Sequence, residues 1–172
     1  MENVLAGAYP VLSATPRRWI DLIETLPGAL LAQRPAANEW SALDCLHHLL
    51  DTERGVFPVR IRAFLEGRNF PAFDPDTQGT KPDPSKRTSD YAGEFAGFRG
   101  ENLSLLKQVT PDDLRRKARH EELGVVTLSE MLHEWAGHDL MHLVQAERAM
   151  MQPFIKGCGP WKRIFVDHVA RP

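Results

Sequence analysis

The stretch of sequence that decides the fold spans residues 127–151 and reads TLSEMLHEWAGHDLMHLVQAERAMM. Its first four residues, Thr127-Leu128-Ser129-Glu130, fit a capping box, in which the Thr and Glu side chains each satisfy a free backbone donor at the helix start. Apolar side chains then recur at helical spacing to about Met151, and Pro153 marks the expected end. The pattern predicts a long helix with one buried face.

Two histidines of this helix are aimed at its buried side. His138 and His142 lie four residues apart, so their side chains leave the same face one turn apart. On a helical wheel His142 falls inside the apolar arc and His138 on its flank, whereas His133 falls on the opposite, solvent-facing side. Buried imidazoles cost free energy unless they are hydrogen-bonded or bind a ligand. Spacing alone leaves two explanations open: core histidines with hydrogen-bond partners, or two ligands of one metal ion.

Three further helices are expected from their cap, proline and glycine signals. They run from Thr15-Pro16 to Pro27-Gly28, from Ser41 to about Glu66 with a kink or a weakened turn at Pro58, and from about Ser89 to Gln108. Residues 68–88 are rich in proline and glycine and predict a long loop that either crosses the bundle or forms a lid. We therefore expect an all-α fold, a four-helix bundle with a long crossover loop between helices 2 and 3, in a single domain over residues 1–172.

The shorter segments carry weaker signals. Residues 116–126 are expected to be irregular or weakly extended, with a turn at Leu123-Gly124, and the tail after Pro153 to pack against the body as a short helix or strand. Gly93, Gly97 and Gly100 share one helix face, which would permit a close helix approach. This glycine face and Trp161 in the tail are also candidate contacts of a homodimer.

Composition excludes several classes of protein. The 172 residues are 42% hydrophobic with a net charge of −2, and this lack of basic excess argues against a nucleic-acid partner. No apolar run approaches the roughly 18 residues that cross a bilayer, and the first residues lack a signal-peptide pattern. Two cysteines are too few for a disulfide framework. We expect a cytoplasmic protein without a membrane partner.

A third ligand for the histidine pair would come from the second helix, which offers His47 and His48. Both lie away from the centre of that helix's apolar arc, so periodicity does not choose between them. Glu53 falls inside the arc and is a candidate for a buried ion pair or for supporting a ligand. Cys45 lies three residues before His48 and could bring a thiol near a metal, although a small buried hydrophobe is the simpler interpretation.

Three segments, in this order along the chain, resemble the DinB/YfiT-like superfamily of metal-binding four-helix bundles. They are Glu39-Trp40-Ser41, the run HHLLDTE at 47–53 and the run GHDLMH at 137–142. The likeness covers nearly the whole chain and includes the long crossover loop. It implies that His48, His138 and His142 hold a divalent metal ion, Zn²⁺ or Ni²⁺, and it gives His47 no role.

The resemblance also implies a class of function. Relatives include S-transferases and isomerases that use low-molecular-weight thiols, and proteins described as metal-dependent hydrolases. Three imidazole ligands would leave a coordination position open, as in catalytic sites. We therefore expect an enzyme acting on a small-molecule substrate, with thiol S-transfer ahead of hydrolysis, and a pocket flanked by residues 68–88. A non-catalytic, stress-related bundle is the alternative, and it predicts a fourth protein ligand or a closed site.

The acid or base of such a reaction is not determined by the sequence. Glu53, Glu134 and Asp139 are candidates on position alone. Asp139 lies inside the apolar arc of its helix and would either orient a ligand histidine or be a buried cap partner.

Overall fold

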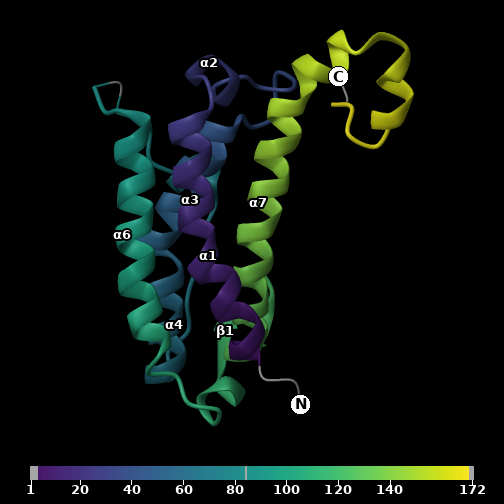
Figure 1. The fold of residues 1–172 in the computed structure, drawn as a ribbon. Helices are drawn as coiled ribbons and strands as arrows, with labels where there is room; N and C mark the ends of the chain where they lie inside the picture. Colours follow the sequence, from purple (N-terminus) through teal and green to yellow (C-terminus); the bar gives the residue numbers. More distant parts are fainter. Residues whose placement is uncertain (1–3, 84, 171–172) are drawn as a thin grey trace.

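Four long helices lie side by side in the computed structural model, which describes residues 4–83 and 85–170 (Figure 1). They are α1 (Val4–Thr25), α3 (Ala42–Gly55), α6 (Thr88–Leu106) and α7 (Leu128–Gly157). α1 and α3 each pack against both α6 and α7, which closes the bundle. The predicted four-helix bundle is confirmed. Residues 1–3 of the N-terminal stretch, Pro84 of the predicted loop and residues 171–172 lie outside the described residues.

The first helix begins earlier than the sequence indicated. α1 starts at Val4, and Pro10 and Pro16 lie inside it. Thr15 does not cap the helix, because its hydroxyl donates to the Val11 carbonyl at 2.9 Å. Buried residues recur along one face, so packing against α6 and α7 outweighs the cost of the prolines. The predicted start at Thr15-Pro16 is therefore wrong. The short helix α2 (Gly28–Leu31) follows.

The predicted second helix is divided into two. α3 ends at Gly55, and Val56 separates it from α4 (Phe57–Glu66). Pro58 occupies the first turn of α4, where its missing N–H has no intrahelical partner to lose. The proline therefore begins a new helix rather than kinking a continuous one. Gly67 ends α4 in the left-handed conformation (φ 68°), as its position predicted.

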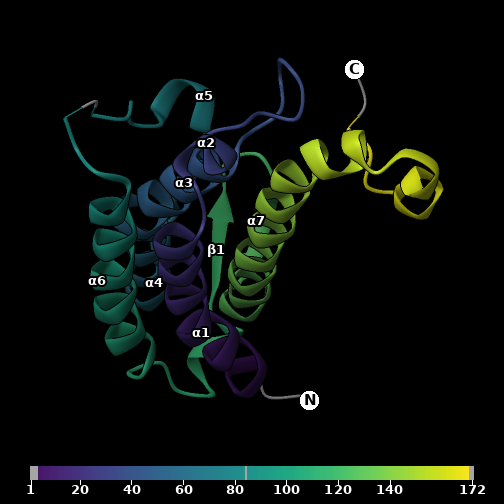
Figure 2. The same ribbon diagram turned by 45° about the horizontal axis from the view of Figure 1, so that its top comes forward.

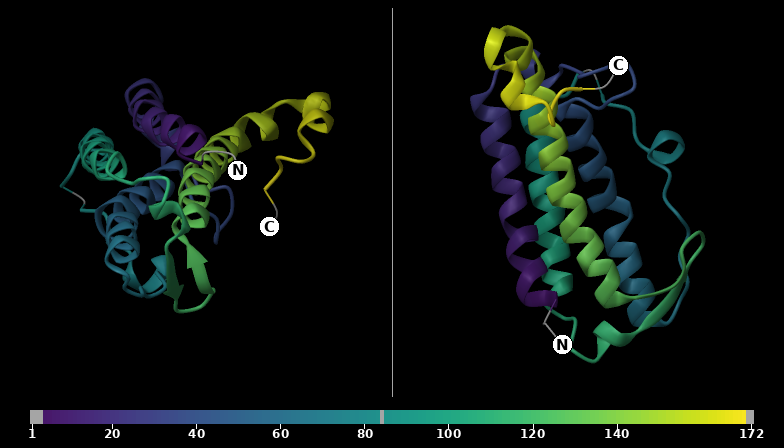
Figure 3. Two further views of the ribbon diagram at one scale, coloured as in Figure 1. Left: turned by 90° about the horizontal axis from the view of Figure 1, so that it is seen from below. Right: turned by 90° about the vertical axis from the view of Figure 1, so that its right-hand side faces the viewer.

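A crossover segment and a small hairpin cover one side of the bundle (Figure 3, right). The crossover contains the short helix α5 (Pro75–Gln78), and Asp51 of α3 anchors it by accepting bonds from the backbone N–H and the hydroxyl of Thr80 at 2.7 and 2.6 Å. The weakly extended segment is the antiparallel hairpin of β1 (Lys117–His120) and β2 (Gly124–Thr127), preceded by a 3₁₀ turn at Asp113–Arg115. Figure 2 shows β1 lying between α1 and α7 in projection.

The last helix and the tail differ from expectation. α7 begins at the predicted capping box but continues through Pro153 to Gly157, with Ile155 buried in its last turns. The 3₁₀ helix Gly159–Phe165 then protrudes from the bundle (Figures 1 and 3). The tail folds back onto α7, whose Arg148 and Gln152 donate to the His168 carbonyl. The predicted short helix is present, but Trp161, Ile164 and Val166 are 66%, 67% and 64% exposed, so the predicted packing of these side chains against the body is wrong.

The glycine face of α6 is open. A Cβ atom added to Gly93, Gly97 or Gly100 would meet no heavy atom within 4 Å. The expected close helix approach is therefore absent from the described part of the chain, because α6 packs through its other face, on which Phe95 and Arg99 are buried. No described helix has the length and hydropathy needed to cross a bilayer.

A buried ion network joins the helices at mid-height. Arg99 of α6 pairs with Glu53 of α3 at 2.7 Å and with both carboxylate oxygens of Asp139 of α7 at 2.6 and 2.9 Å. All three side chains are fully buried. Arg99 also donates to the Leu12 carbonyl of α1 at 2.8 Å, so one guanidinium of α6 contacts the three other long helices.

Further hydrogen bonds hold Glu53 in this network. Asn102 donates to the Glu53 carboxylate and to its backbone carbonyl at 2.8 Å each, and the Trp135 indole donates to the same carboxylate at 2.8 Å. Burial opposes the charge of Arg99, but the hydrogen bonds and attraction of Asp139 and Glu53 prevail and raise its pKa. Arg99 therefore keeps its positive charge throughout the ordinary pH range.

Removing Arg99 should destabilise the fold strongly. Arg99→Met leaves two carboxylates buried without their cation, and we expect it to lower the free energy of unfolding by about 3–5 kcal/mol. Urea unfolding followed by circular dichroism measures this. The matched control is Arg17→Met, which breaks an exposed i,i+4 pair with Asp21 and should cost at most about 1 kcal/mol. Equal losses in the two variants would contradict this role of the network.

Candidate metal centre

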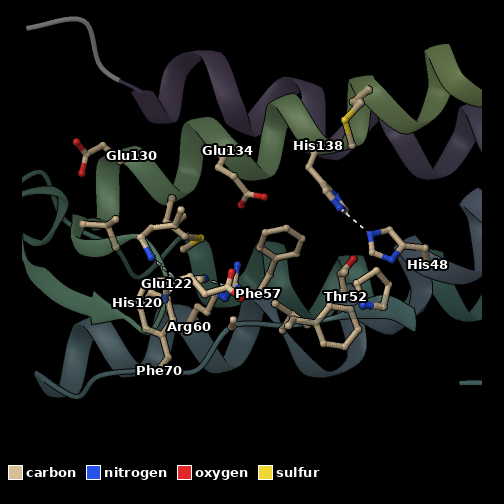
Figure 4. A pocket seen from close by; sticks show the side chains of 18 of the residues that line it. His48, Thr52, Phe57, Arg60, Phe70, His120, Glu122, Glu130, Glu134 and His138 are labelled. Carbon is tan, nitrogen blue, oxygen red and sulfur yellow. Dashed lines mark hydrogen bonds between the residues drawn. The ribbon is translucent and has the colours of Figure 1, made fainter. Parts of the chain in front are cut away.

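Three histidines converge where α3 faces α7. His48 comes from α3, and His138 and His142 come from α7. His138 Nε2 lies 2.9 Å from His48 Nε2 and 3.2 Å from His142 Nε2, and one nitrogen of each ring lies within 4.8 Å of the other two. Figure 4 shows His48 and His138 pointing toward one another at one end of the pocket. The structure thus brings together the three residues that the resemblance selected.

Local packing fixes the orientation of these rings. The capping box of Ser41 and Asp44 starts α3 immediately after Trp40, whose ring stacks on His142 (centroids 5.7 Å apart, 16° between planes). Phe57 of α4 packs edge-on against His138 at 5.5 Å and stacks on Trp135 at 4.7 Å. Because Trp135 is bonded to Glu53, the ion network supports this side of the site.

The donor set fits a divalent metal ion. Burial lowers the pKa of His48 to about 4 and of His138 to about 2, and it also lowers the pKa of His142, so all three rings are neutral near pH 7. His142 Nδ1–H donates to Gln145 Oε1 at 2.9 Å, which leaves the Nε2 lone pair facing inward. Two nitrogens bound to one tetrahedral Zn²⁺ lie roughly 3.3 Å apart, close to the spacing found here.

In the part of the chain that the structure describes, the His48 and His138 rings lack the hydrogen bond at Nδ1 that the His142 ring makes. The buried Nδ1 atoms of His48 and His138 have no hydrogen-bond partner within the described residues. Asp139, expected either to orient a ligand histidine or to be a cap partner, does neither, because both of its oxygens bind Arg99. Asp139, the residue after His138, is instead part of the buried ion network.

The histidines line a cavity of about 600 Å³. Its walls are mostly apolar and include Trp40, Phe57, Phe70, Phe73, Val126 and Met131. Phe70 and Phe73 belong to the crossover segment and Val126 to the hairpin, so both covering elements help to form the cavity. No fourth His, Cys, Asp or Glu joins the cluster among the described residues.

The remaining candidate residues lie outside the cluster. His47 packs its ring against Tyr91 at 4.0 Å, and His133 is exposed. Cys45 is fully buried in the core, where burial raises the pKa of its thiol to about 12, so the simpler interpretation holds. Glu53 forms the buried ion pair that was one of its two predicted roles.

Sequence reasoning did not find two polar residues of the cavity, Arg60 of α4 and His120 of β1. Neither carries a motif, and the hairpin that brings His120 to the cavity gave only a weak strand signal. Glu134, one turn before His138 on α7, also lines the cavity and was a candidate on position alone.

Comparison with known protein families matches residues 12–146 to the DinB superfamily. This chain belongs to the DinB superfamily. Among solved structures, this chain is similar to YfiT from Bacillus subtilis. YfiT is described as a probable metal-dependent hydrolase with an unusual four-helix bundle topology. The TM-score is 0.73 at 18% identity, with 84% of each chain covered, which demonstrates a shared fold. Comparison with curated proteins gave no match.

Metal binding by this DinB-superfamily chain should depend on each of the three histidines. We expect about one Zn²⁺ or Ni²⁺ per chain after equilibrium dialysis, and loss of that ion in His48→Ala, His138→Ala and His142→Ala, since two imidazoles bind far more weakly than three. Elemental analysis measures the ratio. His133→Ala, on the exposed face of the same helix, is the control and should keep the ion. A variant of the three that retains full metal content would not be a ligand.

Proposed function

We propose that this protein is a metal-dependent enzyme that acts on a small organic molecule, with a divalent ion held by His48, His138 and His142. The observation that carries the proposal is that three neutral imidazole nitrogens converge at the wall of a large, mainly apolar cavity. When bound, such an ion lowers the pKa of a coordinated water or thiol and so supplies a nucleophile near neutral pH.

The non-catalytic alternative fits the described residues less well. A structural metal site is usually completed by four protein ligands. The cluster here has three, and it faces a cavity rather than the packed core. Both features favour a site that admits a ligand.

Within this class we propose transfer of a low-molecular-weight thiol to an organic electrophile. In such a reaction the sulfur forms a bond to the electrophilic carbon, the leaving group departs with its electron pair, and the thiol proton goes to a base. The apolar walls can hold the carbon skeleton of the electrophile beside the histidines. Hydrolysis is the second candidate, and it is favoured by the shared fold with YfiT, which is described as a probable metal-dependent hydrolase.

Glu134 is our candidate for the base. It lies one helical turn before His138, and Figure 4 shows its carboxylate directed into the pocket. Its side chain is partly exposed, yet desolvation of the carboxylate raises its pKa, an effect that the nearby charge of Arg60 partly offsets. A carboxylate with a raised pKa is a better proton acceptor for a thiol or a water.

Three predictions from the sequence stay predictions. They are the single domain over residues 1–172, the homodimer through the glycine face of α6 and Trp161, and the cytoplasmic location. Light scattering coupled to gel filtration tests the homodimer.

Activity should follow the metal ligands. We expect the zinc- or nickel-loaded protein to catalyse substitution of the chloride of chlorodinitrobenzene by a small thiol, which forms a C–S bond and breaks the C–Cl bond, or else hydrolysis of nitrophenyl acetate. His138→Ala should abolish the catalysed rate, because the nucleophile then loses its activating ion, while His133→Ala should retain it. Thiol-dependent turnover supports S-transfer, and turnover of the ester alone supports hydrolysis. Activity that survives in His138→Ala would overturn the proposal.

Glu134→Gln should separate proton transfer from metal binding. We expect kcat to fall roughly 100-fold, the range typical of a lost general base, with unchanged metal content. The pH-rate profile should also lose its acidic limb, because glutamine does not titrate. If kcat is unaffected, Glu134 does not serve as the base.

A further inference from the structure

The hairpin end of the cavity holds a second polar group, formed by Arg60 and His120. Both line the cavity, and in Figure 4 they lie at the other end of the drawn pocket from His48. His120 Nδ1 accepts hydrogen bonds from the backbone N–H groups of Glu122 and Leu123 at 3.1 and 3.3 Å. A nitrogen that accepts cannot also carry a proton, so the proton of the neutral ring is on Nε2.

The Nε2–H of His120 faces another donor. Arg60 Nη2 lies 3.4 Å away, and a guanidinium has donors only. Neither side chain can therefore accept the hydrogen bond that the other donates. Burial and the charge of Arg60 lower the pKa of His120, which keeps its ring neutral beside the guanidinium. The pair presents two N–H donors and one positive charge to the cavity, and this arrangement requires an acceptor that the two side chains do not supply.

The pair is held in place by Phe70. The Arg60 guanidinium carbon lies 5.4 Å from the Phe70 ring centroid, and the His120 ring meets the same ring edge-on at 5.6 Å. Phe70 is itself fixed to β1, because its backbone N–H donates to the Arg119 carbonyl at 3.2 Å. Among the described carboxylates, none forms an ion pair with Arg60. Glu134 attracts Arg60 electrostatically across the cavity, but neither Arg60 nor His120 donates a hydrogen bond to a carboxylate among the described residues.

We propose that Arg60 and His120 form a carboxylate-binding subsite, and that the cavity takes a small molecule with an apolar body and a carboxylate at one end. The apolar walls between the subsite and the three histidines fit such a body. A monoanion is favoured over a phosphate dianion because Glu122, Glu130 and Glu134 line the same cavity and would repel a second negative charge. The assignment of such carboxylates as substrates rests on the proposed function. Their binding to Arg60 and His120 does not require the metal.

The test is isothermal titration of the full chain in EDTA near neutral pH. The probes are phenylbutyrate, its neutral isostere phenylbutyramide and phenylpropylphosphonate. We expect the carboxylate to bind most tightly. Arg60→Gln should weaken carboxylate binding roughly tenfold to a hundredfold, the range for a lost charged hydrogen bond, and leave amide binding unchanged. Arg60→Lys, which keeps the charge but loses the planar fork, should lie between the two.

The control variant is Arg62→Gln, which removes the same charge from an exposed position on the same helix. It should bind phenylbutyrate like the parent, and thermal unfolding of each variant checks its fold. Equal affinity for the acid and the amide, an equal loss in Arg62→Gln, or tighter binding of the phosphonate would overturn the proposal. So would a lack of phenylbutyrate binding at millimolar concentration. If His138→Ala loses activity yet binds phenylbutyrate normally, the subsite and the metal site are independent.

Discussion

The rest of the structure depends on one buried guanidinium. Arg99 lies at mid-height in the bundle and hydrogen-bonds to α1, α3 and α7 from α6. Burying three charged groups costs several kcal/mol per ion, and the ion pairs and hydrogen bonds of the two Arg99 Nη atoms offset that cost. A rotation of α3 or α7 about its own axis would leave a carboxylate buried without its cation. The network therefore specifies how these helices face one another, which apolar packing alone leaves open to alternatives.

The orientation of α3 and α7 set by the ion network also positions the three histidines. Asp139 is the neighbour of His138 in sequence, and Glu53 lies little more than one turn beyond His48 on α3. Trp135 links the two sites directly, since its indole bonds to Glu53 while its ring stacks on Phe57, which in turn packs against His138. Carboxylates that would ordinarily orient ligand histidines are instead committed to the core. The same helix faces thus build the fold and position the imidazole nitrogens.

Much of the fold follows from sequence, because local signals and packing agree along α7. Its capping box and periodicity predict the helix and place His138 and His142 on one buried side. Periodicity failed to choose His48, because the site lies at the edge of the apolar arc and only the resemblance selected it. Arg99 was missed because its partners are at least 40 residues away in sequence. Similarly, Arg60 and His120 come together only through tertiary packing. The start of α1 was predicted wrongly because Pro10 and Pro16 indicate a helix boundary, whereas packing keeps them inside the helix.

X-ray absorption at the metal edge of the zinc-loaded full chain tests the central claim most directly. The account predicts three imidazole nitrogens at about 2.0–2.1 Å with one further light ligand, as expected for a site with an open position. A sulfur at about 2.3 Å, or a first shell lacking the imidazole signature, would contradict it.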